Sequence, residues 1–278
     1  MKEMMIQEIQ DISLEIMKHI DAFCKERHLT YFIDSGTLLG AARHKGFIPW
    51  DDDADIVMPR PDYDRFVKEY TDCEEYKLYS PDRHNCLLHY SRMCEMKRTY
   101  FKASLPWTTE LPGVGVDIIP LDGLPNDVET FDSMVSQICK NRNRLWKLRT
   151  AIKPTLRVDD NTNILCVMKA ILRFVRSLWF RVGFNYRVGR VLMNIAKINL
   201  SYDYESSPMC YYTAITADRR KFWKKEWFSS VVYLDFCDTK FPAPIDYESR
   251  LTAEYGDWRT PPPDKRITHG SVQTMLWR

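Results

Sequence analysis

The chain has 278 residues, of which 45% are apolar and 28% charged, so it can bury a large core and is neither disordered nor collagen-like. Its 40 basic and 38 acidic residues leave a formal charge of +2, which is too near zero to indicate a nucleic-acid-binding protein. Neither a G-x-G-x-x-G nor a G-x-x-x-x-G-K-[ST] string is present, which argues against a Rossmann dinucleotide site and a P-loop.

The cysteines and the N-terminus bear on the cellular compartment. The eight cysteines are scattered without a C-x-x-C pair or zinc-finger spacing, so we expect reduced thiols. The first ten residues contain no apolar run of signal-peptide length, which predicts a cytoplasmic protein. The least charged long apolar stretch, 163–182, contains four basic residues, too many for a membrane-spanning helix, although such a segment can lie on a membrane surface.

Hydrophobic periodicity predicts alternating helices and strands in the first seventy residues. A helix over about 2–27 follows from apolar residues at steps of three and four, namely Met5, Ile9, Ile12, Ile16, Ile20 and Phe23. In chain order the pattern then predicts a strand at 31–33, a turn at Ser35-Gly36, a helix at 37–43, a loop at 45–52, a strand at 54–58 and a helix containing Tyr63, Phe66 and Tyr70.

The rest of the chain continues this mixture of elements. Expected in order are strands at 76–79, 86–96, 100–102 and 114–119 (the last ended by Pro120), a helix at 126–149 capped by Asn126 and Glu129, a hairpin of 231–236 with 240–241, and a helix at 247–254. These elements predict an α/β fold with a mixed sheet flanked by helices.

The middle of the chain is strongly basic. Residues 133–200 contain fourteen Lys or Arg and two acids, which leaves a charge of −10 on the remainder. We therefore expect a core at 1–125, a basic helical insertion at 126–200 and a segment at 201–278 that completes the same domain. Lys169, Arg173 and Arg176 would share a helical face, as an interfacial helix on an anionic membrane requires, but a helical subdomain with a solvated basic side explains the pattern equally well.

Four carboxylates crowd into five residues at Asp51, Asp52, Asp53 and Asp55. In an extended strand Asp53 and Asp55 leave the same face with Cα atoms about 6.5 Å apart, close enough for both to bind one cation. Oxygen ligands alone favour Mg²⁺ or Mn²⁺, and Asp117, in a second strand, would add a third carboxylate. The alternatives are a solvated acidic pair at a strand edge and a strand-end cap at Asp117.

A turn of small residues precedes the acidic segment. Ser35, Gly36 and Thr37 open a helix, so their backbone N–H groups and the positive end of the helix dipole suit a phosphate. An ordinary helix start is the alternative reading. A phosphate site beside metal-binding carboxylates predicts phosphoryl chemistry.

The segments 31–44 and 46–56 together resemble the signature of the LicD-family phosphotransferases, which include bacterial phosphocholine transferases and are related to the fukutin group. Residues 116–122, 255–258, 261–263 and His269 are similar to that family as well. The resemblance implies a nucleotidyltransferase-type fold whose metal site comprises the turn at Ser35 to Thr37, the Asp53 and Asp55 pair, and Asp117. Ala54 stands where a bulkier aliphatic residue is usual, which concerns packing rather than chemistry.

The resemblance also implies a reaction. Mg²⁺ or Mn²⁺ on Asp53 and Asp55 would bind the diphosphate of a CDP-activated alcohol, CDP-choline above all, and CMP would leave as a cell-surface glycan hydroxyl, in some cases lipid-linked, attacks. Asp117 would complete the metal shell or take the hydroxyl proton. Candidate phosphate contacts are Arg43, Lys45, Lys265, Arg266 and His269. Candidate aromatic contacts for choline are Trp50, Trp107, Tyr90 and Tyr100.

Two other functions stay open at this point. The same carboxylates could catalyse nucleotidyl transfer from a nucleoside triphosphate, with pyrophosphate as the product. Alternatively, residues 133–200 could bind anionic lipid in a non-catalytic protein, in which the acids only support the fold. Neither reading involves nucleic acid. In the phosphotransferase reading, the basic insertion could dock at the inner face of the membrane, where lipid-linked glycan acceptors are assembled.

Overall fold

The computed structural model describes residues 2–83, 88, 90–102, 113–125, 127–151, 175, 183–212, 223–261 and 274–278. Several residues singled out in the sequence lie outside this part of the chain: Trp107, Lys169, Arg173, Arg176, Lys265, Arg266 and His269.

The helices of the described residues are α1 (Ile6–Arg27), α2 (Ser35–His44), α3 (Arg60–Glu69), α4 (Val128–Ala151), α6 (Phe184–Asn199) and α7 (Tyr247–Tyr255), with short 3-10 helices at Pro81–Arg83 and Lys225–Phe228. The strands are β1 (Phe32–Ile33), β2 (Asp55–Pro59), β3 (Tyr76–Tyr79), β4 (Ser91–Glu95), β5 (Thr99–Lys102), β6 (Gly115–Leu124), β7 (Met209–Tyr212), β8 (Trp223–Lys224), β9 (Val231–Phe236), β10 (Thr239–Pro244) and β11 (Thr274–Trp277).

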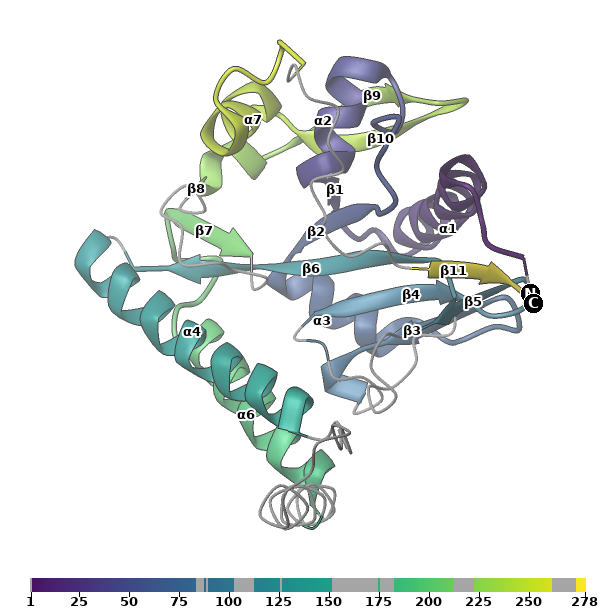
Figure 1. The fold of residues 1–278 in the computed structure, drawn as a ribbon. Helices are drawn as coiled ribbons and strands as arrows, with labels where there is room; N and C mark the ends of the chain where they lie inside the picture. The colour runs from purple at the N-terminus through teal and green to yellow at the C-terminus, as the bar shows by residue number, and fades with distance from the viewer. Residues whose placement is uncertain are drawn as a thin grey trace, which may run out of the picture.

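A mixed sheet with β6 at its centre organises the fold (Figure 1). Its strand order is β1-β2-β6-β4-β3, and β7 extends it by pairing with both β6 and β8. Strands β2 and β6 run parallel, whereas β6 is antiparallel to β4 and to β7. The predicted α/β fold, a mixed sheet flanked by helices, is confirmed.

Strand β6 is longer than the sequence predicted. Pro120 was expected to end it, but the strand continues to Leu124. Its pairing with β4 reaches Ile118 and its pairing with β7 begins at Leu121, so Pro120 lies at the junction between two antiparallel neighbours. Proline lacks an N–H, and at this junction that lack interrupts neither antiparallel ladder.

Helix α1 packs its predicted apolar face into the main core. Ile12, Ile16 and Ile20 are fully buried there. Met5, which the periodicity assigned to this face, is instead the residue before the helix and is exposed, because the helix begins only at Ile6. The described cysteines form no disulfide, which agrees with the expected reduced thiols.

Helices α4 and α6 form an antiparallel pair that extends away from the sheet (Figure 1). The first half of α4 packs through Phe131 and Ile138 against Tyr211 on β7. At its start the Asp127 carboxylate accepts the Thr130 N–H at 2.7 Å, and the predicted cap residue Asn126 lies outside the described residues. No helix among the described residues combines the length and apolar character that crossing a bilayer requires.

The two ends of the chain meet at one edge of the molecule (Figure 1). Strand β11 pairs with β5, the Met4 N–H donates to the Met275 carbonyl at 2.9 Å, and the Trp277 N–H donates to that of Lys2 at 2.9 Å. The predicted hairpin is present as β9 and β10, and the predicted helix after it as α7.

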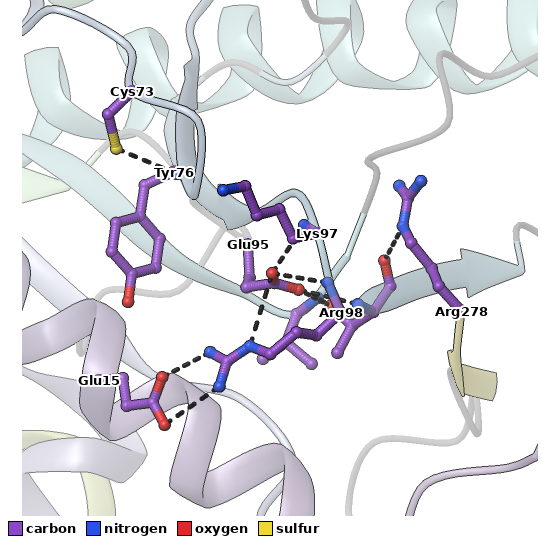
Figure 2. A network of polar contacts seen from close by, with 9 residues as sticks. Glu15, Cys73, Tyr76, Glu95, Lys97, Arg98 and Arg278 are labelled. Carbon is purple, nitrogen blue, oxygen red and sulfur yellow. Dashed lines mark hydrogen bonds and ion pairs between the residues drawn. The ribbon is translucent and has the colours of Figure 1, made fainter.

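The turn between β4 and β5 is organised by one buried carboxylate, that of Glu95 (Figure 2). Glu95 accepts the backbone N–H groups of Lys97 and Arg98 at 2.7 Å and of Thr99 at 2.8 Å, together with the Thr99 hydroxyl. Burial opposes ionisation, but these donors outweigh it and hold the pKa of Glu95 below its ordinary value. Arg98 in turn reaches Glu15 on α1, so the turn fastens α1 to the sheet.

We expect Glu95→Gln to lower the free energy of unfolding by about 3 kcal/mol, because an amide replaces a charged acceptor that serves buried donors. Since the folded pKa is depressed, the wild-type stability from this group is present above the unfolded pKa and is lost as the pH falls through the folded value. Urea unfolding across acidic pH measures both effects. Glu15→Gln, which breaks only the half-exposed pair with Arg98, is the control and should change stability by at most about 1 kcal/mol.

Candidate functional site

The small-residue turn of the sequence is the first turn of α2. Asp34 is the cap residue, and its carbonyl accepts the Leu38 N–H at 3.0 Å, so the helix includes the expected turn at Ser35 and Gly36. Ser35 has a φ of +51°, a left-handed conformation that costs about 1 kcal/mol in a residue with a side chain. The surrounding contacts therefore hold this helix start in a defined shape.

The acidic loop runs back along α2 from its end to its beginning. Two glycines one helical turn apart allow this close approach: a Cβ on Gly40 would lie 2.4 Å from the Gly46 carbonyl oxygen, and one on Gly36 would lie 2.6 Å from Asp51 Oδ2. The buried Gln10 side chain on α1 donates to the Ile48 and Asp51 carbonyls and fixes the loop from the other side. Asp51 is thereby brought to the positive end of α2.

Strand β2 brings the next carboxylate to the same end of α2. The Asp55 N–H donates to the Thr37 hydroxyl at 2.9 Å, and the Asp55 carbonyl accepts the Asp34 N–H at 3.2 Å. In the parallel pair, Asp55 is the register partner of Asp117 on β6. Asp55 and Asp117 therefore lie side by side at one end of the β2–β6 pair. Ala54 beside them is fully buried.

The electrostatics show that these acids are close neighbours. Burial, followed by the charge and hydrogen bonding of Asp53, raises the pKa of Asp51 to about 8. Burial and then the charges of Asp53 and Asp117 raise the pKa of Asp55 well above its ordinary value. Burial also raises the pKa of Asp117, where the charge of Asp53 adds to the shift. The charge of Asp53 therefore acts on all three of the other carboxylates, those of Asp51, Asp55 and Asp117.

This donor set fits a hard divalent cation. One carboxylate oxygen from each of Asp51, Asp52 and Asp53 lies within 4.8 Å of the others, and a cation among oxygen ligands would supply the missing countercharge. The prediction placed Asp53 with Asp55 on one strand face, but β2 begins at Asp55 and Asp53 belongs to the loop before it. The convergence of Asp53 on its neighbours therefore comes from the loop and not from strand alternation. That Asp53, Asp55 and Asp117 bind the metal stays a prediction.

Asp117 has two partners that the sequence did not reveal. Arg92 on β4 lies across from it, with Nη1 3.2 Å from Asp117 Oδ1 and both side chains nearly buried. Tyr90 hydrogen-bonds Asp117, and the charge of Asp117, followed by burial, raises the pKa of Tyr90 well above its ordinary value. An arginine next to the apolar Met93 and Cys94 in a predicted strand was the available signal for such a buried partner.

Behind the start of α2 lies a buried ion-pair network. Arg250 on α7 donates to Asp34 Oδ2 at 2.6 Å and contacts Glu254 Oε2 at 2.6 Å, and its guanidinium stacks 3.6 Å from the centre of the Trp223 ring. Arg250 and Asp34 are both fully buried. Because Asp34 caps α2 and binds the Asp55 carbonyl, α7 fixes the position of the site. No local sequence pattern predicts an ion pair between residues as far apart in the chain as Asp34 and Arg250.

The predicted basic contacts lie at the other end of α2. Arg43 donates to the Trp258 carbonyl at 3.1 Å, and Lys45 caps the C-terminus of the helix and lines an open cavity of about 360 Å³ with residues of the β9–β10 hairpin. Ten helical residues separate the ends of α2 by about 15 Å, so the structure does not bring these two cations to the acids. Trp50 is half-buried against the main core, with its ring 6.5 Å from that of His44.

Comparisons with known proteins identify a family of similar sequence. Residues 28–158 match the family described as LicD/FKTN/FKRP, nucleotidyltransferase domain. Over 275 residues, 95% of each chain, the sequence is 29% identical to the lipopolysaccharide cholinephosphotransferase LicD of Haemophilus influenzae. An uncharacterised protein of Rickettsia typhi is 44% identical over 62 residues, 22% of this chain and 20% of its own. The residues that the family match spans contain α2, the acidic loop, β2 and Asp117, so the candidate site lies within the part of the chain that is similar to this family.

Proposed function

We propose that the chain is an enzyme that transfers a phospho-alcohol group from a CDP-activated donor to a glycan hydroxyl and releases CMP. Phosphocholine is the favoured group, because the relative from H. influenzae is named as a lipopolysaccharide cholinephosphotransferase and aligns with 95% of the chain. Lipopolysaccharide or a related cell-surface glycan is the corresponding acceptor.

The observation that carries this proposal is the carboxylate cluster around Asp53. Four acids from one loop and two strands share one end of the sheet, and the raised pKa values of Asp51, Asp55 and Asp117 show how unfavourable the cluster is without a countercharge. Asp51, Asp53 and Asp55 would hold Mg²⁺ or Mn²⁺, with Asp117 as a further ligand or as a base. Bound there, the cation would neutralise negative charge on the donor diphosphate and on the leaving CMP.

The protein groups around the cluster have complementary roles. The backbone N–H groups of Ser35, Gly36 and Thr37 belong to the first turn of α2, beside which Asp51 lies, and would bind donor phosphate oxygens. The acceptor oxygen would form a bond to the phosphorus of the phospho-alcohol group as the bond from that phosphorus to the CMP oxygen breaks. Asp117, held by Arg92 and Tyr90, would accept the hydroxyl proton.

Choline itself needs aromatic contacts, because a quaternary ammonium group donates no conventional hydrogen bond. Tyr90 is the best placed of the described candidates, since it hydrogen-bonds Asp117. Trp50 precedes the first acid of the loop and is partly exposed. These two side chains would favour choline over smaller head groups.

The test is a panel of CDP-choline, CDP-ethanolamine and CDP-glycerol with purified protein, lipopolysaccharide lacking phosphocholine, and either Mg²⁺ or EDTA. We expect CMP release that requires both acceptor and divalent cation, with a phosphocholine mass added to the glycan. Pyrophosphate released from a nucleoside triphosphate would instead establish nucleotidyl transfer. Absence of product with every donor and cation would refute the proposal.

A further inference from the structure

Helix α6 has two very different stripes along its surface. Val188, Val191 and Ile195 are buried against Leu145 of α4, which accounts for one side of the helix. The other side exposes residues spaced four, three, four and three apart: Tyr186, Arg190, Met193, Lys197 and Leu200. This set, the outer stripe, is a single continuous helical face.

The outer stripe is unusual for a helix face in water. Its Tyr186, Met193 and Leu200 are 69%, 57% and 56% exposed, and they alternate with Arg190 and Lys197. Single exposed apolar residues are common, but three large ones aligned on one stripe indicate a contact surface. Within the described part of the chain, Trp146 on the neighbouring α4 is also 65% exposed.

The helix pair around the stripe is positively charged. Helices α4 and α6 together contain eight Lys or Arg and two acids, Glu129 and Asp132 near the start of α4, although the chain as a whole is close to neutral. A surface of one sign attracts a partner of the opposite sign. The partner must therefore be anionic and must also give apolar side chains an environment away from water.

We propose that the outer stripe of α6 docks on an anionic lipid bilayer. Tyr186, Met193 and Leu200 would enter the boundary between head groups and acyl chains, and Arg190 and Lys197 would extend to lipid phosphates. A nucleic acid would satisfy the cations but would leave Met193 and Leu200 in water. A symmetric dimer through this stripe would bring like charges together. The inference does not depend on the proposed phosphotransfer.

The experiment is flotation of the full chain with vesicles of phosphatidylcholine, with and without phosphatidylglycerol. We expect binding to the anionic vesicles that weakens as salt rises. Arg190→Glu/Lys197→Glu should weaken it by about 30-fold or more, since each basic residue near an anionic surface contributes about a factor of five. Tyr186→Ser/Met193→Ser/Leu200→Ser, which keeps the charge, should also weaken it. Lys68→Glu/Lys224→Glu makes the same charge change on exposed lysines elsewhere and should not.

Circular dichroism checks that each variant keeps the helix content of the wild type before binding is interpreted. The proposal is overturned if the wild type does not float, if both stripe variants bind as tightly as the wild type, or if the lysine control loses as much binding as they do. It is also overturned if the protein prefers single-stranded nucleic acid to vesicles, or if light scattering shows a dimer that the stripe variants abolish while vesicle binding is absent.

Discussion

Replacing Asp53 or Asp55 with Asn is expected to reduce the rate of CMP release from CDP-choline by about 1,000-fold or more, equivalent to about 4 kcal/mol in the barrier. Each change keeps the side-chain shape but removes one negative charge from the group that would hold the cation. Asp53 should have the larger effect, because its charge acts on Asp51, Asp55 and Asp117 alike. Steady-state kinetics with varied Mg²⁺ provide the measurement.

Folding of these variants serves as the internal check. Removing one charge from a mutually repelling cluster should leave the metal-free protein at least as stable as the wild type. Mg²⁺ should stabilise the wild type against heat, by about 2.7 kcal/mol at one hundred times its dissociation constant, and should stabilise Asp53→Asn much less. Asp64→Asn, the same change at an exposed carboxylate on α3, should affect neither readout. Full activity in Asp53→Asn would exclude that residue from the metal site.

Replacing Arg250 with Met is expected to lower the free energy of unfolding by about 3–5 kcal/mol. Methionine has a similar length but no charge, so Asp34 would be left fully buried without its cationic partner. Urea unfolding followed by tryptophan fluorescence measures the effect. Arg259→Met, at a residue that pairs with Glu248 on the surface, is the matched control and should cost less than about 1 kcal/mol.

A second change separates the charge from the volume in this network. Asp34→Asn combined with Arg250→Met removes both charges and should recover part of the stability lost in Arg250→Met alone. If the single variant is as stable as the wild type, Arg250 does not stabilise the start of α2. In that case the double variant should have the same free energy of unfolding as the single variant.

Local patterns predicted most of the elements. The helix at α1, the strands β3, β5 and β9, and the helix α7 were correct because each depends on periodicity within a few residues. The errors were of a different kind. Pro120 was read as a strand end, and only the change of partner from β4 to β7 explains why β6 passes through it. Met5 fell outside α1 because periodicity does not fix where a helix begins.

The sequence by itself determined the fold class, the family resemblance, and the presence of a small-residue helix start followed by an acidic loop, because these depend on residues close together in the chain. Only the tertiary structure decided what surrounds them. The parallel pairing of β2 with β6 placed Asp117 beside Asp55, and Arg92 and Arg250 reached their acids from β4 and α7. Strand order and long-range ion pairs arise from packing of the whole chain, so no local pattern specifies them.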